Sequence, residues 1–384
     1  MRRWYLGILL GSLMWASTVN GSPQYEERPF SLVSSLKIDG TLDLCGERVP
    51  LEVHEVRERL EKELLLTLWD RPQVLLWLKR SRRYLPPIEA LLAKQGMPED
   101  LKYIAIAESA LRPHAGSTKG AIGFWQFMKS TGQKYGLAIN ARIDERRNLL
   151  ASTEAAIRYF KELHQSFRSW TLAAAAFNMG EDGIMAEILE QGTSNYYDLY
   201  LPLETQRFIF RILSVKLVFS EPGKYGFGLA DDDYYPPLDA DLIQVDCLRE
   251  TPIRIVAEAA KTTFKVIKDL NPEIRGHYLA PGIHRILTPK GTSAGFSERY
   301  TGLVEKHLST QEERIYIVEE GDNLSSIAAK FGVPLGALII WNRVDLNRPI
   351  HPGDRLIIHG KETQKGEVVD DDERSETDLT GGER

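Results

Sequence analysis

The sequence predicts a mainly α-helical domain followed by two small α+β units, and three observations support this prediction. Apolar residues recur at helical spacing through most of residues 50–219. An acidic, proline-containing stretch at residues 230–237 then interrupts the helical pattern. Beyond that stretch, the chain repeats itself at a separation of 71 residues. With 384 residues and a hydrophobic fraction of 43%, the chain is long enough for several globular domains.

The boundaries of the expected domains follow from changes in composition along the chain. Helices are expected over residues 50–94, 98–111, 152–164, 170–179 and 204–219, where Gly, Pro and Asn separate the periodic segments. We therefore expect a polar lead at 22–60, a helical domain at 61–228, a linker at 229–240, repeat units at 241–289 and 313–359, and a second linker at 290–312. Residues 360–384 are too polar to bury a core and are expected to form a disordered acidic tail.

The charge of the chain is close to balanced outside this tail. The chain has 54 acidic and 48 basic residues, which gives a formal net charge of -6. The tail alone holds nine acidic and four basic residues, so the rest of the chain is nearly neutral. A nucleic-acid partner is not expected, because such binders use a net positive field against phosphate charge.

The N-terminus has the order of a secretory signal. Met1-Arg2-Arg3 is followed by an apolar run from Trp4 to Ala16 and then by small and polar residues. This run is shorter than the roughly 20 residues that a transmembrane helix needs. We expect a signal peptide at 1–21 and export to the periplasm or cell envelope. The alternatives are an uncleaved anchor, which would associate the protein with a membrane, and a buried first helix. In an oxidising compartment Cys45 and Cys247 could pair, and the sequence leaves this open.

The repeat is found without a gap. Nine positions of the first copy fall on nine of the second: Ile253, Val256, Ala257, Ile267, Asn271, Pro281, Gly282, Ile286 and Leu287 match Leu324, Ile327, Ala328, Leu338, Asn342, Pro352, Gly353, Ile357 and Ile358. The alternative is a coincidence of apolar residues, but the asparagine and the Pro-Gly pair also match in register. Each copy is expected to form a strand, two short helices and a second strand.

The strongest candidate for chemistry is Glu108. It shares one helical stripe with the apolar residues Leu101, Ile104 and Ala105. It also lies in the last turn, because Pro113 disfavours a helical conformation in the residue before it. Burial and the negative end of the helix dipole are both expected to raise the pKa of this carboxyl. A proton held near neutral pH suits general-acid catalysis at a glycosidic oxygen. The alternative is a surface salt bridge with Arg112, which would require the helix to continue.

The motifs around Glu108 carry a family resemblance. The stretch IAIAESALRPHAGSTKGAIGFWQF, together with AAAAFNMGE and LPLETQRF, resembles the Slt-type lytic transglycosylases, which share a fold with goose-type lysozyme. The resemblance implies cleavage of the β-1,4 bond between N-acetylmuramic acid and N-acetylglucosamine in murein, without a cofactor. One glutamate would act first as acid and then as base. The muramoyl 6-hydroxyl would attack its own anomeric carbon and leave a 1,6-anhydro end.

Site residues carry over position by position. The catalytic Glu-Ser pair would be Glu108-Ser109. Substrate contacts would come from Ser117, Gln126 of the Gly-x-x-Gln element, Tyr135, Phe177 and Asn178. The sequence departs from the family where Phe177 replaces a tyrosine and where Phe208 ends an element that usually ends in tyrosine. Two hydroxyls near the carboxylate are therefore missing, which puts full catalytic efficiency in doubt.

Each of these residues also has a structural interpretation. Asn178 could simply end a helix before the C-cap residue Gly180. Gln126 could be a solvated loop residue, and the two serines could be local caps. The aromatic rings of the stretch, Trp125, Phe127 and Tyr135, are core residues as often as sugar platforms.

The second repeat, residues 313–359, resembles the LysM domain, a βααβ module that binds glycans containing N-acetylglucosamine. Its specific features are the Gly321-Asp322-Asn323-Leu324 start and the Pro352-Gly353 pair near its end. The start would contact glycan, although Asp322 is also expected to cap the first helix. The first copy has Glu250-Thr251-Pro252 in place of Gly321-Asp322-Asn323 and is interpreted as a degenerate LysM-like unit.

Three functions remain open at this point. The first is an exported enzyme whose partner is the peptidoglycan glycan strand. The second is a catalytically weak murein-binding scaffold, suggested by Phe177 and Phe208. The third is a hydrolytic lysozyme, which usually adds a second carboxylate; the candidates are Asp144, Glu145, Glu162 and Glu181. The histidines show no ligand spacing, so no metal site is expected.

Overall fold

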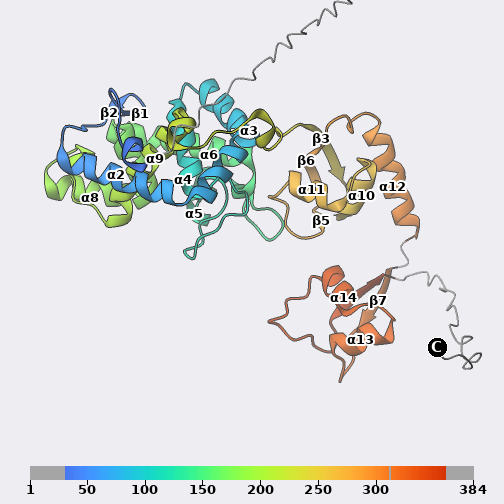
Figure 1. The fold of residues 1–384 in the computed structure, drawn as a ribbon. Helices are drawn as coiled ribbons and strands as arrows, with labels where there is room; N and C mark the ends of the chain where they lie inside the picture. Colours follow the sequence, from blue (N-terminus) through green and yellow to red (C-terminus); the bar gives the residue numbers. More distant parts are fainter. Residues whose placement is uncertain (1–30, 311–312, 360–384) are drawn as a thin grey trace, which may run out of the picture. The chain divides into compact units, whose positions relative to one another are not determined.

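The computed structural model describes residues 31–310 and 313–359. The chain divides into two compact units, each made of two segments. The first unit combines Met1–Lys79 and Ser166–Tyr234, and the second combines Arg80–Gln165 and Tyr235–Arg384. The division falls inside two long helices, α3 (Arg71–Lys94) and α6 (Leu149–Phe167). Each unit is described below by itself (Figure 1). The expected signal peptide and acidic tail lie outside the described residues.

The first unit is built mainly from helices. It contains α1 (Leu32–Ser35), α2 (His54–Trp69), α7 (Trp170–Met179), α8 (Glu181–Gln191) and α9 (Leu203–Ser220). Helix α2 packs along α9 because each carries an apolar stripe at helical spacing. Leu60 and Leu64 on α2 and Ile209 and Leu213 on α9 are fully buried. Helix α7 has the predicted bounds, whereas α8 was not predicted because its apolar pattern is interrupted by Gly183.

The segment predicted as a polar lead is part of this unit from residue 31 onward. Its short strands β1 (Asp43–Leu44) and β2 (Glu47–Arg48) form an antiparallel hairpin, and Leu42, Leu44, Val49 and Leu51 are buried. The carboxylate of Glu47 accepts hydrogen bonds from the backbone N–H groups of Trp170 and Thr171, at 2.5 and 2.9 Å. An acidic side chain there satisfies the free N–H groups at the start of α7.

The second unit includes the helix that carries Glu108. A 3-10 turn at Glu99–Leu101 leads into α4 (Lys102–Ser109), and the short α5 (Lys129–Lys134) precedes α6. The core of this part includes Ile104, Ala105, Phe124, Trp125 and Phe160, all at most 1% exposed. The extended loops between α4 and α6 therefore cover a dense apolar core.

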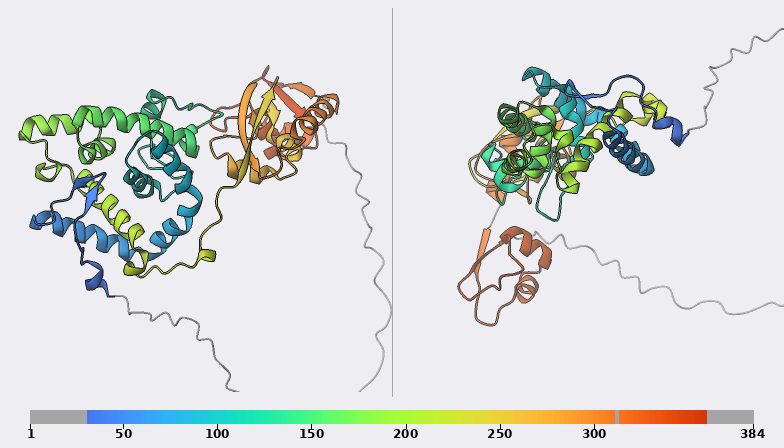
Figure 2. Two further views of the ribbon diagram at one scale, coloured as in Figure 1. Left: turned by 90° about the horizontal axis from the view of Figure 1, so that it is seen from above. Right: turned by 90° about the vertical axis from the view of Figure 1, so that its left-hand side faces the viewer.

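The first repeat has the predicted order of strand, two helices and strand. Strand β3 (Ala240–Cys247) pairs antiparallel with β6 (Gly282–Pro289), and α10 (Ile253–Ala259) and α11 (Phe264–Leu270) lie between them in sequence. The two strands lie side by side in the left view of Figure 2. A second, short ladder joins β4 (Thr251–Pro252) to β5 (Tyr278–Leu279).

The prediction of a linker at 290–312 is wrong for most of that segment. Residues Phe296–Thr310 form helix α12, which packs against α10. Phe296 is 3% exposed and belongs to the same apolar core as Val245, Val256 and Ile286. The apolar residues Phe296, Tyr300 and Leu303 follow helical spacing, but charged residues between them hide the stripe. The first repeat therefore gains a third helix.

The second repeat keeps the same order. Strand β7 (Glu313–Ile317) pairs antiparallel with β8 (Arg355–His359), and α13 (Leu324–Lys330) and α14 (Leu335–Asn342) lie between them in sequence. Helix α13 lies 71 positions after α10, as the repeat predicts. The ungapped match is wrong by one residue in the last strand. Asn271 bonds the backbone of Leu287, whereas Asn342 bonds that of Ile357.

Two further observations concern export and the cysteines. Within residues 31–310 and 313–359, no single helix has the length and apolar character needed to cross a membrane. Only α13 and α14 taken together pass that test, and they are bent by 108°. Cys45 and Cys247 form no disulfide with each other, and they belong to different units.

Candidate active site

Glu108 is half-buried in the last turn of α4, as predicted. The helix ends at Ser109, because Ala110 and Leu111 both adopt left-handed conformations, with φ of 55° and 57°. Two consecutive non-glycine residues in this region are strained, and such strain is typical of functional sites. The guanidinium of Arg80 stabilises the turn by donating to the Ala110 carbonyl at 3.1 Å. A surface pair with Arg112 would need a continued helix, which is not present here.

The two candidate serines make local hydrogen bonds. The Ser109 hydroxyl is buried and donates to the carbonyl of Ala105 at 2.9 Å, one helical turn earlier. The exposed Ser117 hydroxyl accepts from the N–H of Ala121 at 3.1 Å and closes the following turn. Both side chains therefore have the local role that the sequence left open. Their contact with a sugar remains a prediction.

The Gly-x-x-Gln element forms a tight turn packed against residue 146. Gly123 has φ of 87°, and a Cβ atom at this position would lie 1.7 Å from the Arg146 carbonyl oxygen. Only glycine fits there. Gln126 also has positive φ, at 49°, and its side-chain nitrogen donates to the carbonyls of Ala115 and Gly123 at 3.2 and 2.9 Å. Gln126 thus ties its loop to the segment after α4, and its contact with a sugar stays a prediction.

The aromatic rings near this loop lie in the core. Trp125 is fully buried and donates from its indole nitrogen to the Thr153 hydroxyl at 3.0 Å. Phe127 is 2% exposed. Tyr135 is 6% exposed and stacks on Tyr159 with ring centroids 4.6 Å apart. All three rings are packed in the core, and a role as sugar platforms would require them to be accessible.

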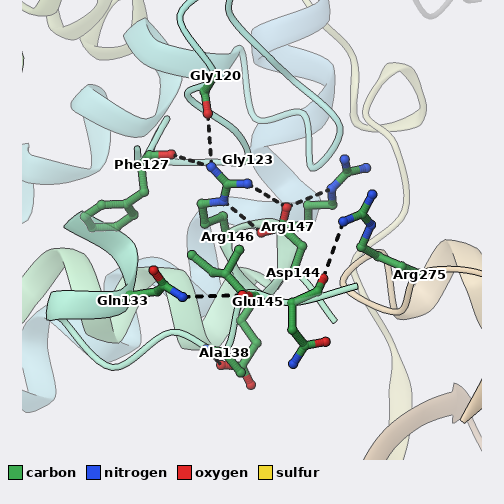
Figure 3. Close-up of polar contacts among 12 residues, drawn as sticks. Gly120, Gly123, Phe127, Gln133, Ala138, Asp144, Glu145, Arg146, Arg147 and Arg275 are labelled. Atoms are coloured by element: carbon green, nitrogen blue, oxygen red, sulfur yellow. Dashed lines mark hydrogen bonds and ion pairs between the residues drawn. The ribbon is translucent and has the colours of Figure 1, made fainter. Parts of the chain in front are cut away.

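A buried ion pair supports the Gly-x-x-Gln turn. Arg146 donates through Nε and Nη2 to the two carboxylate oxygens of Asp144, each at 2.8 Å. Its Nη1 donates to the carbonyls of Gly120 and Phe127 at 3.0 and 3.1 Å (Figure 3). Burial opposes ionisation of Asp144, but the hydrogen bonds from Arg146 outweigh it and hold the pKa of Asp144 below its ordinary value. Arg146 was missed in the sequence because a run of charged residues resembles a solvated surface.

The three carboxylates of this unit that could serve as a second catalytic carboxylate each accept hydrogen bonds from neighbouring groups. Asp144 pairs with Arg146. Glu145 accepts from the N–H of Ala138 at 2.7 Å. Glu162 accepts from Lys134 and from the Tyr135 hydroxyl, at 2.7 and 2.8 Å, and these bonds lower the pKa of Glu162. Burial and the bond to Glu162 raise the pKa of Tyr135 to about 12. Each of these carboxylates therefore has a structural partner within the unit.

The remaining candidate residues of the helical domain belong to the other compact unit. Phe177 and Asn178 are half-buried near the end of α7, and Asn178 accepts from the Thr205 hydroxyl at 3.1 Å. Gly180 ends the helix with φ of 101°, so the C-cap interpretation of this motif holds. Phe208 is 1% exposed on α9. It packs in the core, which leaves little room for a hydroxyl at that position.

The start of the second repeat differs in detail from the prediction. Asn323, and not Asp322, caps α13: its side chain accepts from the Ser326 N–H at 2.9 Å, and the Ser326 hydroxyl accepts from the Asn323 N–H at 3.0 Å. Asp322 instead accepts from the Tyr316 hydroxyl and the Glu319 N–H, at 2.5 and 2.9 Å. These bonds hold the pKa of Asp322 below its usual range. Gly321 has φ of 85°, and Leu324 packs against the core of the repeat. Both help fix this loop.

Comparisons with known proteins match two segments of this chain to domain families and find relatives over most of its length. A model of the transglycosylase SLT domain matches residues 86–199, and a model of the LysM domain matches residues 316–359. Membrane-bound lytic murein transglycosylase D of Escherichia coli K12 is 31% identical over 343 residues, which cover 85% of this chain and 74% of that protein. The protein of the same name from Escherichia coli O6:H1 matches equally. The solved structure of the 70 kDa soluble lytic transglycosylase Slt70 from Escherichia coli covers 47% of this chain and 31% of that chain, with 15% identity and a TM-score of 0.32.

The SLT model spans the segment that holds both Glu108 and the Gly-x-x-Gln turn, and together with the murein transglycosylase relatives it defines the class as lytic transglycosylase. Within this class, the family follows from the 31% identity to the Escherichia coli K12 relative and from the 85% of this chain and 74% of that protein that the match covers. The chain belongs to the family of membrane-bound lytic murein transglycosylase D.

Proposed function

We propose that this chain is an exported lytic transglycosylase that cleaves the β-1,4 bond between N-acetylmuramic acid and N-acetylglucosamine in murein. Glu108 donates its proton to the glycosidic oxygen as the bond to the muramoyl anomeric carbon breaks. The muramoyl 6-hydroxyl then bonds to that carbon, and the Glu108 carboxylate accepts the hydroxyl proton. The glutamate is thereby restored, and the product ends in a 1,6-anhydro ring.

The observation that carries this proposal is the position of Glu108. Its backbone is fixed by the left-handed turn at Ala110 and Leu111, and Arg80 stabilises that turn. A rigidly placed acid can be held within reach of the scissile oxygen. Gln126, whose loop is tied to the chain just after α4, is proposed to contact the sugar through its amide oxygen.

A hydrolytic mechanism is disfavoured because each of the four candidate second carboxylates bonds another group, Glu181 accepting from the Ser166 hydroxyl at 2.8 Å. Hydrolysis by inversion needs a second carboxylate to activate water, and retaining hydrolysis needs one as nucleophile. In this unit Asp144, Glu145 and Glu162 are engaged by Arg146, the Ala138 N–H and Lys134. An internal hydroxyl nucleophile requires no second carboxylate. A catalytically weak murein-binding scaffold is the second candidate, because the half-buried Phe177 lacks a hydroxyl.

The second repeat is proposed to hold the enzyme on glycan strands through the loop Gly321-Asp322-Asn323-Leu324. The bonds of Asp322 to Tyr316 and Glu319 keep this loop in one conformation, which lowers the entropy lost on binding. Retention in the periplasm or cell envelope follows from the signal order of the N-terminus, with membrane association through that segment as a further expectation.

The proposal is tested by comparing wild-type protein with Glu108→Gln on purified murein sacculi. The amide has nearly the same shape but cannot donate the proton, so release of soluble fragments should fall at least about a thousandfold, near the upper range for loss of a general acid. Binding of sacculi should be unchanged. Full activity of Glu108→Gln would show that another residue supplies the proton.

A further inference from the structure

The first repeat contacts a loop of the helical domain through backbone hydrogen bonds. The Arg275 N–H donates to the Arg142 carbonyl, and the Asp144 N–H donates to the Glu273 carbonyl, both at 2.8 Å. Between these bonds, Ile143 and Ile274 form an antiparallel β-bridge. The Arg275 side chain adds a longer contact of 3.4 Å to the Asn140 carbonyl (Figure 3). Residues about 130 positions apart in sequence are thus joined as in a short sheet.

The turn of the repeat that makes this contact is itself fixed. Ile274 is 7% exposed and belongs to the apolar core of the repeat. The ammonium of Lys268 donates to the carbonyls of Ile274 and Gly276. Glu273 is also 7% exposed, so the turn is packed on several sides. A turn held this firmly can impose its geometry on a partner loop.

From this contact, a continuous series of bonds leads to the Gly-x-x-Gln turn. Asp144, whose backbone is bound by the repeat, holds the guanidinium of Arg146 in a two-bonded pair. Arg146 donates to Gly120 and Phe127, on the two sides of the turn that contains Gln126. The Arg146 carbonyl also lies where a side chain on Gly123 would be. Any shift of Asp144 must therefore be transmitted to this turn.

The first repeat has also lost the loop arrangement of the second. Its loops before α10 and after α11 are joined by the ladder of Thr251 to Leu279 and Pro252 to Tyr278, and the Ile253 N–H donates to the His277 carbonyl at 2.9 Å. Within residues 313–359, the only strand pairing is that of β7 with β8. In the first repeat, the loop before α10 and the loop after α11 pair with each other as short strands. The corresponding loops of the second repeat form no such strand pair.

We propose that the first repeat is a positioning element of the active site, and that Arg146 is the positioning residue through which it acts. By holding Asp144, the repeat fixes Arg146 and hence the turn that presents Gln126 beside the segment following Glu108. This inference rests on the proposed function, because it assigns Gln126 to the sugar site. It makes the first repeat a structural support for the Gly-x-x-Gln turn and not a second glycan anchor.

The test removes one backbone donor without changing Arg146. Arg275→Pro lacks the N–H that bonds the Arg142 carbonyl, and Arg275→Ala is its matched control because it keeps that N–H. With soluble murein glycan as substrate, Arg275→Pro should lower kcat about tenfold with KM changed less than twofold, and Arg275→Ala should lie within twofold of wild type. Hydrogen exchange should accelerate at residues 115–127 of Arg275→Pro and stay unchanged in α6.

A second variant keeps the inference testable if Arg275→Pro does not fold. Ile274→Ala trims the bridge residue and should reduce kcat severalfold, with the same local increase in exchange at 115–127. If Arg275→Pro folds and has the kcat and hydrogen exchange of the wild type, the inference is overturned. If Arg275→Pro does not fold, the same result in Ile274→Ala overturns it. The Glu108→Gln variant separates the two claims. If it is inactive while the interface variants behave as wild type, only the positioning role is wrong; if it is active, the proposed function fails.

Discussion

Substituting Gly123 by alanine tests how closely the Gly-x-x-Gln turn is packed. The new Cβ would lie 1.7 Å from the carbonyl oxygen and 2.4 Å from the carbonyl carbon of Arg146, whereas ordinary contact begins at 3.4 Å. Both atoms are backbone, so they cannot rotate away. The turn must retreat by roughly 1.5 Å to relieve the repulsion. That movement breaks the bonds of Arg146 to Gly120 and Phe127.

Gly120→Ala is the matched control. Gly120 lies in the same loop with nearly the same φ, 89° against 87°, but a Cβ there would have nothing within 4 Å. Both variants carry the cost of an alanine in the left-handed region, about 1–2 kcal/mol. Only Gly123→Ala also loses two bonds to a charged donor, each worth about 1.5–3 kcal/mol. The difference in unfolding free energy should be about 3 kcal/mol or more.

Two measurements check this prediction. A further loss of about 3 kcal/mol corresponds to a melting temperature lower by about 6–12 °C in Gly123→Ala than in Gly120→Ala. Misplacement of the turn by more than 1 Å should lower kcat about a hundredfold, while Gly120→Ala retains most of its activity. Equal melting temperatures and equal rates for the two variants would refute the packing of Gly123 against Arg146.

Three further predictions concern other parts of the chain. Phe208→Tyr should lower the melting temperature without raising the cleavage rate, because the ring is 1% exposed and a buried hydroxyl without a partner is costly. The half-buried Phe177→Tyr should be better tolerated, and a rate increase confined to Phe208→Tyr would contradict both statements. Burial raises the pKa of Glu273, so the folded state pays an increasing penalty as pH rises above the unfolded value of about 4.3. Glu273→Gln should therefore raise the melting temperature at pH 7 and change it little at pH 4, and the reverse order would show that the carboxylate is stabilising. Residues 313–359 expressed alone should be retained on insoluble murein, and residues 241–310 should not; the opposite result in this pull-down would reverse their roles.

Local patterns predicted much of the helical framework. The spacing of apolar residues placed α7 at its observed bounds and put Glu108 in the last turn of α4. The repeat also placed α10 and α13 in register. These features depend on neighbours in sequence, where helical periodicity and the turn signals of Gly and Pro are strong.

Features that depend on distant contacts could not be predicted. Arg146 lies in a charged run, and only the folded chain shows that Asp144 and two carbonyls surround it. The extra helix α12 was hidden because its apolar stripe is narrow. Asn323 and Asp322 are equally good caps by residue type, so the choice between them required the backbone geometry.

The reaction itself is tested most directly by digesting purified sacculi with the wild-type protein in oxygen-18 water and analysing the soluble products by mass spectrometry. Attack by the muramoyl 6-hydroxyl incorporates no solvent oxygen. The products should therefore carry unlabelled 1,6-anhydromuramic ends, and Glu108→Gln should release none. Oxygen-18 at the muramic reducing end would show that water is the nucleophile and would contradict the proposed mechanism.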